Sequence, residues 1–293
     1  MKKIFYFLIL SVAVIFGCDK IDTPLPFVEV DTSGIKWDDS LYTESAPGMR
    51  KIIIEEYTGH LCTNCPAGAK EVHRLDSIYE EQLIPVSVHA TSFAMPTGND
   101  VSSPPDGIPD YTEDYRTEAG DEYATTFGVA GIPKAAVSRL NNSTMVGISQ
   151  WQIDIDGIKN DVPKVSIGLS TLYDDSTRTL KTYVSSEWLS SEAGDFNIQL
   201  YLVEDSVIGD QLDGSTHILQ SYTHRHMLRK AINGTWGTQI PSANQGDIFT
   251  TDISIELDPK WNKDHCIVVA YVYKGNGDYE IIQAEELHIV SEH

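Results

Sequence analysis

Cysteine is scarce in this chain, which has only four among its 293 residues. Small secreted domains that depend on disulfides carry many more, so the count excludes a disulfide-rich scaffold. Cys18 lies near the N-terminus, and Cys62 and Cys65 form a Cys-x-x-Cys pair. Cys266 stands alone in an apolar, strand-like run, where we expect a buried and unreactive thiol.

Positively charged residues are also few in this chain. The chain has 21 Lys and Arg against 43 Asp and Glu, which gives a net charge of −22 at pH 7. Such a surface repels the phosphates of nucleic acids and anionic lipid head groups. We therefore exclude nucleic acid as a partner.

The sequence lacks long apolar runs except at its beginning. Ile4 to Phe16 is apolar and follows Lys2 and Lys3, but a membrane-spanning helix needs about 20 apolar residues. A positive start, an apolar core and a small residue are the order of a signal peptide, which we assign to residues 1–17. The residues that precede and include Cys18 resemble a lipobox. We predict that Cys18 is acylated and anchors the protein at the outer membrane, on either face; an ordinary secretory peptide is the alternative.

Residues 18–48 contain several prolines and acids and little periodicity, and we interpret them as a tether. Residues 49–162 have the pattern of an α/β domain. Three consecutive isoleucines at 52–54 predict a buried strand over 51–57, and apolar residues at helical spacing after Pro66 predict a helix. With a strand over 84–89 they form one βαβ unit. A helix over 119–127 and a strand over 134–140 follow, after an irregular, proline-rich and acidic insertion at 90–118. A calcium site in this insertion is an alternative to a solvated loop, but the ligand spacing of an EF-hand is missing.

From Pro163 onward the apolar residues alternate with polar ones. This period of two recurs in several short segments that are separated by turn residues. Short strands without helices predict an all-β sandwich over residues 163–293.

The Cys-x-x-Cys pair has the spacing of a redox site. Two intervening residues bring both sulfurs within disulfide reach at a strand-to-helix turn. The unpaired N–H groups of the helix N-terminus favour a thiolate there, which would make Cys62 the nucleophile. Cys65 would then resolve the mixed disulfide. His60, two residues before Cys62, is a candidate to stabilise the thiolate; the alternative is an exposed side chain.

Metal binding is the main alternative chemistry for these residues. A structural zinc site needs four ligands, no second Cys-x-x-Cys exists, and His60 and His73 would have to complete the site. His224 and His226 would share one face of a predicted strand over 222–229, but no third ligand is evident. We expect no metal and no cofactor.

Two further features resemble the thioredoxin fold. Ile132 and Pro133 lie after a predicted helix and before a strand, where that family has a cis-proline whose preceding residue pairs with an extended substrate. Glu56 lies six residues before Cys62, where thioredoxins have a buried acid that accepts a proton from the resolving cysteine. A solvated acid at the strand end is an equal alternative for Glu56. The aromatic residue before the first cysteine and the proline between the cysteines are missing, so the family's redox potential is not transferred.

Three segments resemble a family of Bacteroidetes outer-membrane lipoproteins related to a twenty-eight-kilodalton outer-membrane protein. They are residues 114–120, residues 127–129, and the stretch from Tyr222 to Gly237. The resemblance implies an α/β thioredoxin-like domain, followed by an all-β immunoglobulin-like sandwich, anchored at the outer membrane. It carries no firm biochemical activity.

Two functional hypotheses follow. The first is a membrane-anchored protein that exchanges thiols and disulfides with envelope proteins or peptides, using Cys62, Cys65, Ile132, Pro133 and Glu56. The second is a surface binding or adhesion lipoprotein in which Cys62 and Cys65 form a structural disulfide.

Overall fold

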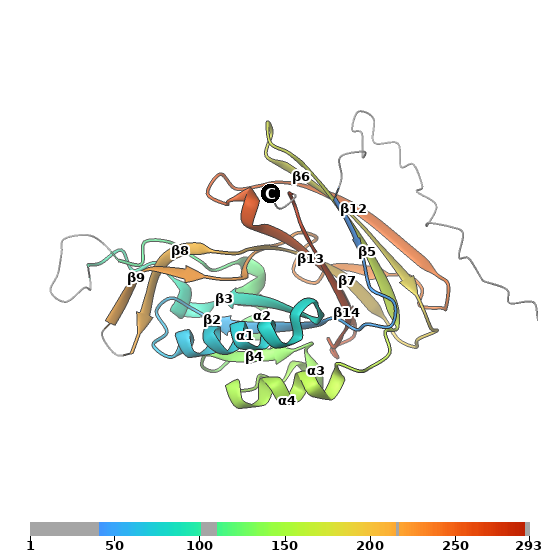
Figure 1. Cartoon of the computed structure of the whole chain (residues 1–293), viewed down its shortest axis with the longest axis horizontal. Coiled ribbons are helices and arrows are strands. Elements are labelled where there is room, and N and C mark those ends of the chain that lie inside the picture. The colour runs from blue at the N-terminus through green and yellow to red at the C-terminus, as the bar shows by residue number, and fades with distance from the viewer. Residues whose placement is uncertain (1–40, 101–109, 215–216, 291–293) are drawn as a thin grey trace, which may run out of the picture. The chain divides into compact units, whose positions relative to one another are not determined.

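A βαβ unit forms the first half of the fold, in a computed structural model that describes residues 41–100, 110–214 and 217–290. The strands β2 (Ile52–Thr58) and β3 (Leu83–His89) are parallel neighbours, joined by helix α1 (Cys65–Tyr79) (Figure 1). All residues of β2 and β3 are buried, because both faces of these strands are covered. This agrees with the consecutive isoleucines at the start of β2.

The strands β2 and β3 belong to a large sheet of eight strands, in the order β14-β13-β7-β10-β3-β2-β4, with β11 paired to β7. Its remaining members are β4 (Lys134–Val137), β7 (Phe196–Glu204), β10 (Met227–Ala231), β11 (Thr238–Ile240), β13 (Cys266–Lys274) and β14 (Ile281–His288). A small sheet has the order β1-β5-β6-β12, formed by β1 (Leu41–Glu44), β5 (Val165–Asp174), β6 (Thr179–Trp188) and β12 (Ile248–Glu256). The strands β8 (Val207–Asp213) and β9 (His217–His224) pair as a separate hairpin.

Different elements pack against the two faces of the large sheet. One buried cluster packs Val165 and Leu180 of the small sheet against Leu200 and Val268 of the large sheet. A second cluster covers β2, β3 and β4 with α1 and α4 (Ile148–Ile158). A third cluster lies on the opposite face and contains α2 (Glu118–Thr126).

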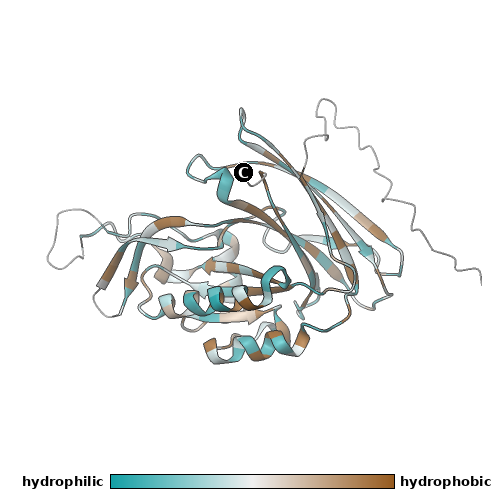
Figure 2. Ribbon diagram, in the orientation of Figure 1, coloured by the Kyte–Doolittle hydropathy of each residue, from teal (hydrophilic) through white to brown (hydrophobic). Residues whose placement is uncertain are grey.

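Amphipathic helices explain this layering. Figure 2 shows apolar and polar stretches following each other along α4, and its buried residues are Trp151, Ile155 and Ile158. The remaining helical segments are short: α3 (Leu140–Ser143), η2 (Glu80–Gln82), η3 (Thr91–Ala94) and η4 (Lys263–His265). The protein is therefore a mixed α/β structure made mostly of strands. This confirms the prediction of an α/β segment followed by a segment of strands at the level of secondary structure.

The large sheet joins the two segments that we predicted as domains. Strand β10 pairs in parallel with β3, at Met227 and Ser87, and in antiparallel with β7. All described residues lie in one compact unit, Trp37–His293. Part of the predicted tether also enters the fold, because β1 pairs with β5. The acylation site predicted at Cys18 lies outside the described residues.

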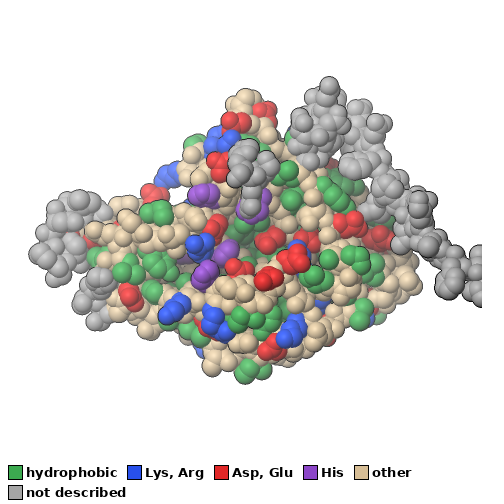
Figure 3. Space-filling model, in the orientation of Figure 1, with side chains coloured by type: hydrophobic (Ala, Val, Ile, Leu, Met, Phe, Trp, Pro, Cys, Tyr) green, Lys and Arg blue, Asp and Glu red, His purple; other side chains and the backbone are tan. Residues whose placement is uncertain are grey.

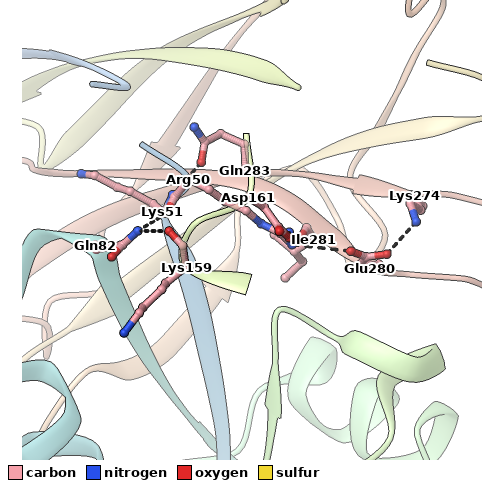
Figure 4. Close-up of polar contacts among 9 residues, drawn as sticks. All are labelled: Arg50, Lys51, Gln82, Lys159, Asp161, Lys274, Glu280, Ile281 and Gln283. Carbon is pink, nitrogen blue, oxygen red and sulfur yellow. Dashed lines mark hydrogen bonds and ion pairs between the residues drawn. The ribbon is translucent and has the colours of Figure 1, made fainter. Parts of the chain in front are cut away.

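Polar contacts hold the start of β2 to the second half of the chain (Figure 4). The Arg50 guanidinium donates to Asp161 at 2.7 Å and to the Ile281 carbonyl at 2.8 Å. The Lys51 amide donates to the Gln283 side chain at 2.8 Å. These bonds fix the end of α4 and strand β14 beside β2.

A buried ion pair stabilises the opposite face of the large sheet. Arg139 donates two hydrogen bonds to Glu55, at 2.7 and 2.8 Å, and the two side chains are 1% and 0% exposed. The predicted strand over 134–140 is shorter than expected because Ser138 and Arg139 have φ angles of +42° and +52°. This turn directs Arg139 to Glu55 and to the hydroxyls of Tyr201 and Tyr271.

The insertion at 90–118 contains η3 and an isolated bridge between Asn99 and Asp110. Residues 101–109 lie outside the described part. Among the residues that the structure describes, no three His, Cys, Asp or Glu side chains are placed to hold a metal ion.

Candidate redox site at Cys62 and Cys65

Cys62 and Cys65 are joined by a disulfide at the start of α1. Strand β2 ends at Thr58, a turn follows, and the helix begins at Cys65 with Pro66 in its first turn. Proline suits this position because the first N–H groups of a helix have no partner within the helix. The N-terminus of α1 therefore lies directly beside the sulfur atoms.

The segment before β4 lies against this disulfide. The Ile132–Pro133 peptide bond is cis. The Cys62 Sγ atom is 3.8 Å from the carbonyl oxygen of Ile132. The tertiary structure thus brings together residues that are 70 positions apart in the sequence.

Glu56 lies beneath the first turn of α1, and its residue is 1% exposed. A Cβ atom on Gly68 of the helix would be 2.3 Å from Glu56 Oε1 and 2.8 Å from the Pro133 ring, so glycine permits this close approach. Burial raises the pKa of Glu56 from 4.5 to about 8. Of the two alternatives in the sequence, the structure shows the buried acid.

His60 is buried rather than exposed. Its ring is buried, with Nε2 2.9 Å from the Met95 carbonyl oxygen, and its centroid is 5.2 Å from that of Tyr111. Burial lowers the pKa of His60, so the ring is neutral at pH 7. The predicted exposed side chain was wrong, because the loop after Ala90 packs over it, and stabilisation of a Cys62 thiolate stays a prediction.

The β8–β9 hairpin covers the disulfide loop, which the sequence did not indicate. The Leu212 amide donates to the His60 carbonyl at 2.8 Å, and the Gly214 amide donates to the Thr63 carbonyl at 3.2 Å. The Gln211 side-chain amide donates to the Cys62 carbonyl at 3.1 Å. With these contacts, Cys62 is only 3% exposed and Cys65 only 1%.

The predicted strand over 222–229 is interrupted. Strand β9 ends at His224, β10 begins at Met227, and His226 between them has a φ angle of +52°. His224 is buried with Nε2 3.2 Å from the Asp210 carbonyl oxygen. The two histidines therefore do not share the face of one strand as we expected.

Comparison with known proteins adds the family. The model of the family described as outer membrane protein Omp28 matches residues 120–291. No curated protein matches the chain. None of the described helices is long and apolar enough to cross a membrane.

Two solved structures, HBP35 and a structural-genomics protein, share the fold at low identity. HBP35 of Porphyromonas gingivalis is 16% identical, with a TM-score of 0.61 over 84% of this chain and 77% of that chain. A structural-genomics protein of Agrobacterium tumefaciens is 12% identical, with a TM-score of 0.51 over 85% of this chain and 97% of that chain. A domain of the outer membrane lipoprotein Omp28 from P. gingivalis is 21% identical, covers 43% of this chain and 88% of that domain, and has a TM-score of 0.33.

The family match covers more than half of the sequence and confirms the predicted location at the outer membrane. The chain belongs to the outer membrane protein Omp28 family.

Proposed function

We propose that Cys62 and Cys65 exchange thiols and disulfides with envelope proteins or peptides, on a thioredoxin-like unit formed by β2, α1, β3 and β4. The observation that carries this proposal is the contact of 3.8 Å between Cys62 Sγ and the Ile132 carbonyl oxygen. An extended substrate that paired with the Ile132 backbone would present its sulfur to Cys62. We also assign the strands after Pro163 to an immunoglobulin-like arrangement, and the membrane anchor to an acyl group on Cys18.

In the reduced protein, the Cys62 thiolate attacks one sulfur of a substrate disulfide. A bond forms between Cys62 and that sulfur, and the other substrate sulfur leaves as a thiolate that takes up a proton. Cys65 then attacks Cys62, which releases the first substrate sulfur and restores the Cys62–Cys65 disulfide. The substrate is reduced by two electrons and the protein is oxidised by two.

We further propose that Glu56, in its ionised form, accepts the proton from Cys65 in the second step. Its carboxyl lies under the helix that begins at Cys65, and its pKa of about 8 is close to that of a thiol. A carboxyl with an ordinary pKa would accept this proton much less readily. Burial of Glu56 is therefore the feature that suits it to the role.

Substrate size is limited by the cover over the disulfide. Both sulfurs are buried, and β8 contacts the backbone of the loop from Gly59 to Thr63. A protein substrate therefore reaches Cys62 only when β8 separates from that loop. Small reductants need a smaller opening.

A trapping experiment tests the proposal on the chain from residue 19 onward. The Cys65→Ser variant should accumulate a mixed disulfide with a peptide disulfide substrate, whereas Cys62→Ser should not. Insulin reduction and the equilibrium redox potential are measured on the unsubstituted protein. A pair that stays oxidised below about −300 mV, without turnover, would identify a structural disulfide instead.

A further inference from the structure

A cleft of about 320 Å³ opens between α1 and the end of β9. Figure 3 shows histidine, basic and acidic side chains close together above α1 in this region of the surface. The floor consists of Glu56 and Thr58 of β2 and Ser87 and His89 of β3. These are the carboxyl ends of two parallel strands, where α/β sheets commonly bind ligands, and the volume is at the lower end for small-molecule sites.

The floor of the cleft holds two buried polar atoms without a well-formed hydrogen bond in the described structure. They are Oε1 of Glu56 and Nδ1 of His89, on residues that are 1% and 3% exposed. Both residues project from the same face of the sheet, since Glu56 pairs with Ser87 and Thr58 pairs with His89. Buried polar atoms are nearly always paired, so these two indicate that a polar group occupies the cleft.

The wall opposite α1 is close to this floor. The Glu56 carboxyl contributes, after burial, to the raised pKa of Tyr222 on β9. On the α1 side, Cys65, Ala69 and Val72 line the cleft. The site therefore combines a polar floor with a partly apolar side wall, as small-molecule sites commonly do.

Two basic side chains, Lys70 and Arg225, lie on the rim of the cleft. Lys70 is exposed and forms no ion pair with any described residue, and Arg225 pairs with Asp205 at 3.3 Å. Asp205 and Asp76 also face His226, whose pKa is nevertheless lowered by burial. At neutral pH the histidine is uncharged, and the carboxylates of Asp76 and Asp205 balance the charges of Lys70 and Arg225. Lys70 is nevertheless without an ion pair to any described residue, so its ammonium group is available to a ligand. A carboxylate that contacts Lys70 gains a charge-assisted hydrogen bond.

We propose that this cleft binds a carboxylate-bearing molecule the size of an amino acid or a dipeptide. Its carboxylate contacts Lys70 and Arg225, and its polar end forms hydrogen bonds with Glu56 and His89. This binding goes beyond the exchange reaction and does not depend on it, although Cys65 lines the same cleft. A free dipeptide and the C-terminus of a longer peptide present the same chemistry.

The test is a calorimetric titration of the oxidised protein with glycylglycine and with glycylglycine amide. These probes differ only in the carboxylate. We expect the dipeptide to bind and its amide to bind about tenfold more weakly, because charge-assisted hydrogen bonds are lost. Equal affinities, or no binding of the dipeptide, would overturn the proposal.

Charge reversal at the rim identifies the site. The double variant Lys70→Glu/Arg225→Glu should weaken glycylglycine by about tenfold or more. Lys181→Glu on β6 is the matched control, because Lys181 also lacks an ion pair with any described residue, and it should leave the affinity unchanged. Unchanged affinity in the double variant would refute this location.

Two further titrations distinguish a free small molecule from a chain terminus as the ligand, and test whether binding depends on the exchange reaction. A pentapeptide that ends in Gly-Gly should bind as tightly as the dipeptide if the natural ligand is a chain terminus. It should bind more weakly if the natural ligand is a free small molecule. Both results are consistent with a carboxylate-binding site in the cleft. The titration is repeated with Cys62→Ser. Because this variant cannot exchange disulfides, binding by it establishes the cleft even if the exchange function fails.

Discussion

Replacing Glu56 with Gln tests the burial of this carboxyl, because glutamine keeps the size of the side chain and removes its ionisation. The pKa of Glu56 is raised from 4.5 to about 8 in the folded protein by burial. The folded state therefore binds more protons than the unfolded state between these two values. The free energy of unfolding must fall as the pH rises through this range.

The magnitude follows from the size of the pKa shift. A shift from 4.5 to about 8 corresponds to about 5 kcal/mol of lost stability once the pH exceeds the folded pKa. Below pH 4.5 the carboxyl is protonated in both states, so no cost arises. The Gln variant should match the unsubstituted protein at low pH and exceed it by several kcal/mol at pH 9.

Urea unfolding of both proteins at a series of pH values measures the difference, with the disulfide intact. Titration of all other groups cancels in this difference. Glu81→Gln is the control, because Glu81 is exposed, and its difference from the unsubstituted protein should not change with pH. A difference for Glu56→Gln that is equally constant would show that Glu56 ionises like a solvated acid, which would refute the reasoning.

Three further predictions concern the packing around the site. Gln211→Ala should speed reduction of the disulfide by dithiothreitol about fivefold or more, because side-chain hydrogen bonds of about 1 kcal/mol each that hold β8 to the loop are lost; an unchanged rate would show that β8 does not limit access. Gly68→Ala should destabilise by about 1–3 kcal/mol in urea unfolding, since its Cβ would overlap the buried carboxyl beneath the helix. Gly157→Ala in α4 has open space and should stabilise by about 0.5–1 kcal/mol, so equal effects of the two substitutions would contradict the packing. Arg139→Leu should lower the free energy of unfolding by about 3–5 kcal/mol in urea unfolding, because the Glu55 carboxylate is left buried without its ion-pair partner. The double variant Arg139→Leu/Glu55→Leu should lose less stability. A double variant as unstable as the single one would contradict the ion pair as the cause.

The sequence determined the local elements around the candidate site. The three isoleucines of β2, Pro66 after Cys65, and the apolar spacing of α1 predicted a strand, a turn and a helix near the observed bounds. These predictions succeeded because strand and helix periods, and the φ angle of proline, depend on residues that are neighbours in the chain. The same reasoning predicted the separate short strands after Pro163. It did not reveal that several of them continue the sheet of β2 and β3.

Tertiary structure decided how accessible and how charged the site is. Gln211 and Cys62 are 149 residues apart, and the loop after Ala90 packs on His60 from another direction. No local pattern encodes these contacts, because the side chains that bury Cys62, Glu56 and His60 come from distant segments. Burial then sets the pKa of Glu56 and closes the approach to the disulfide. The sequence by itself determined that two cysteines lie at the start of a helix; only the folded chain determined what can reach them, since access and desolvation depend on what packs above a residue rather than on its neighbours in the chain.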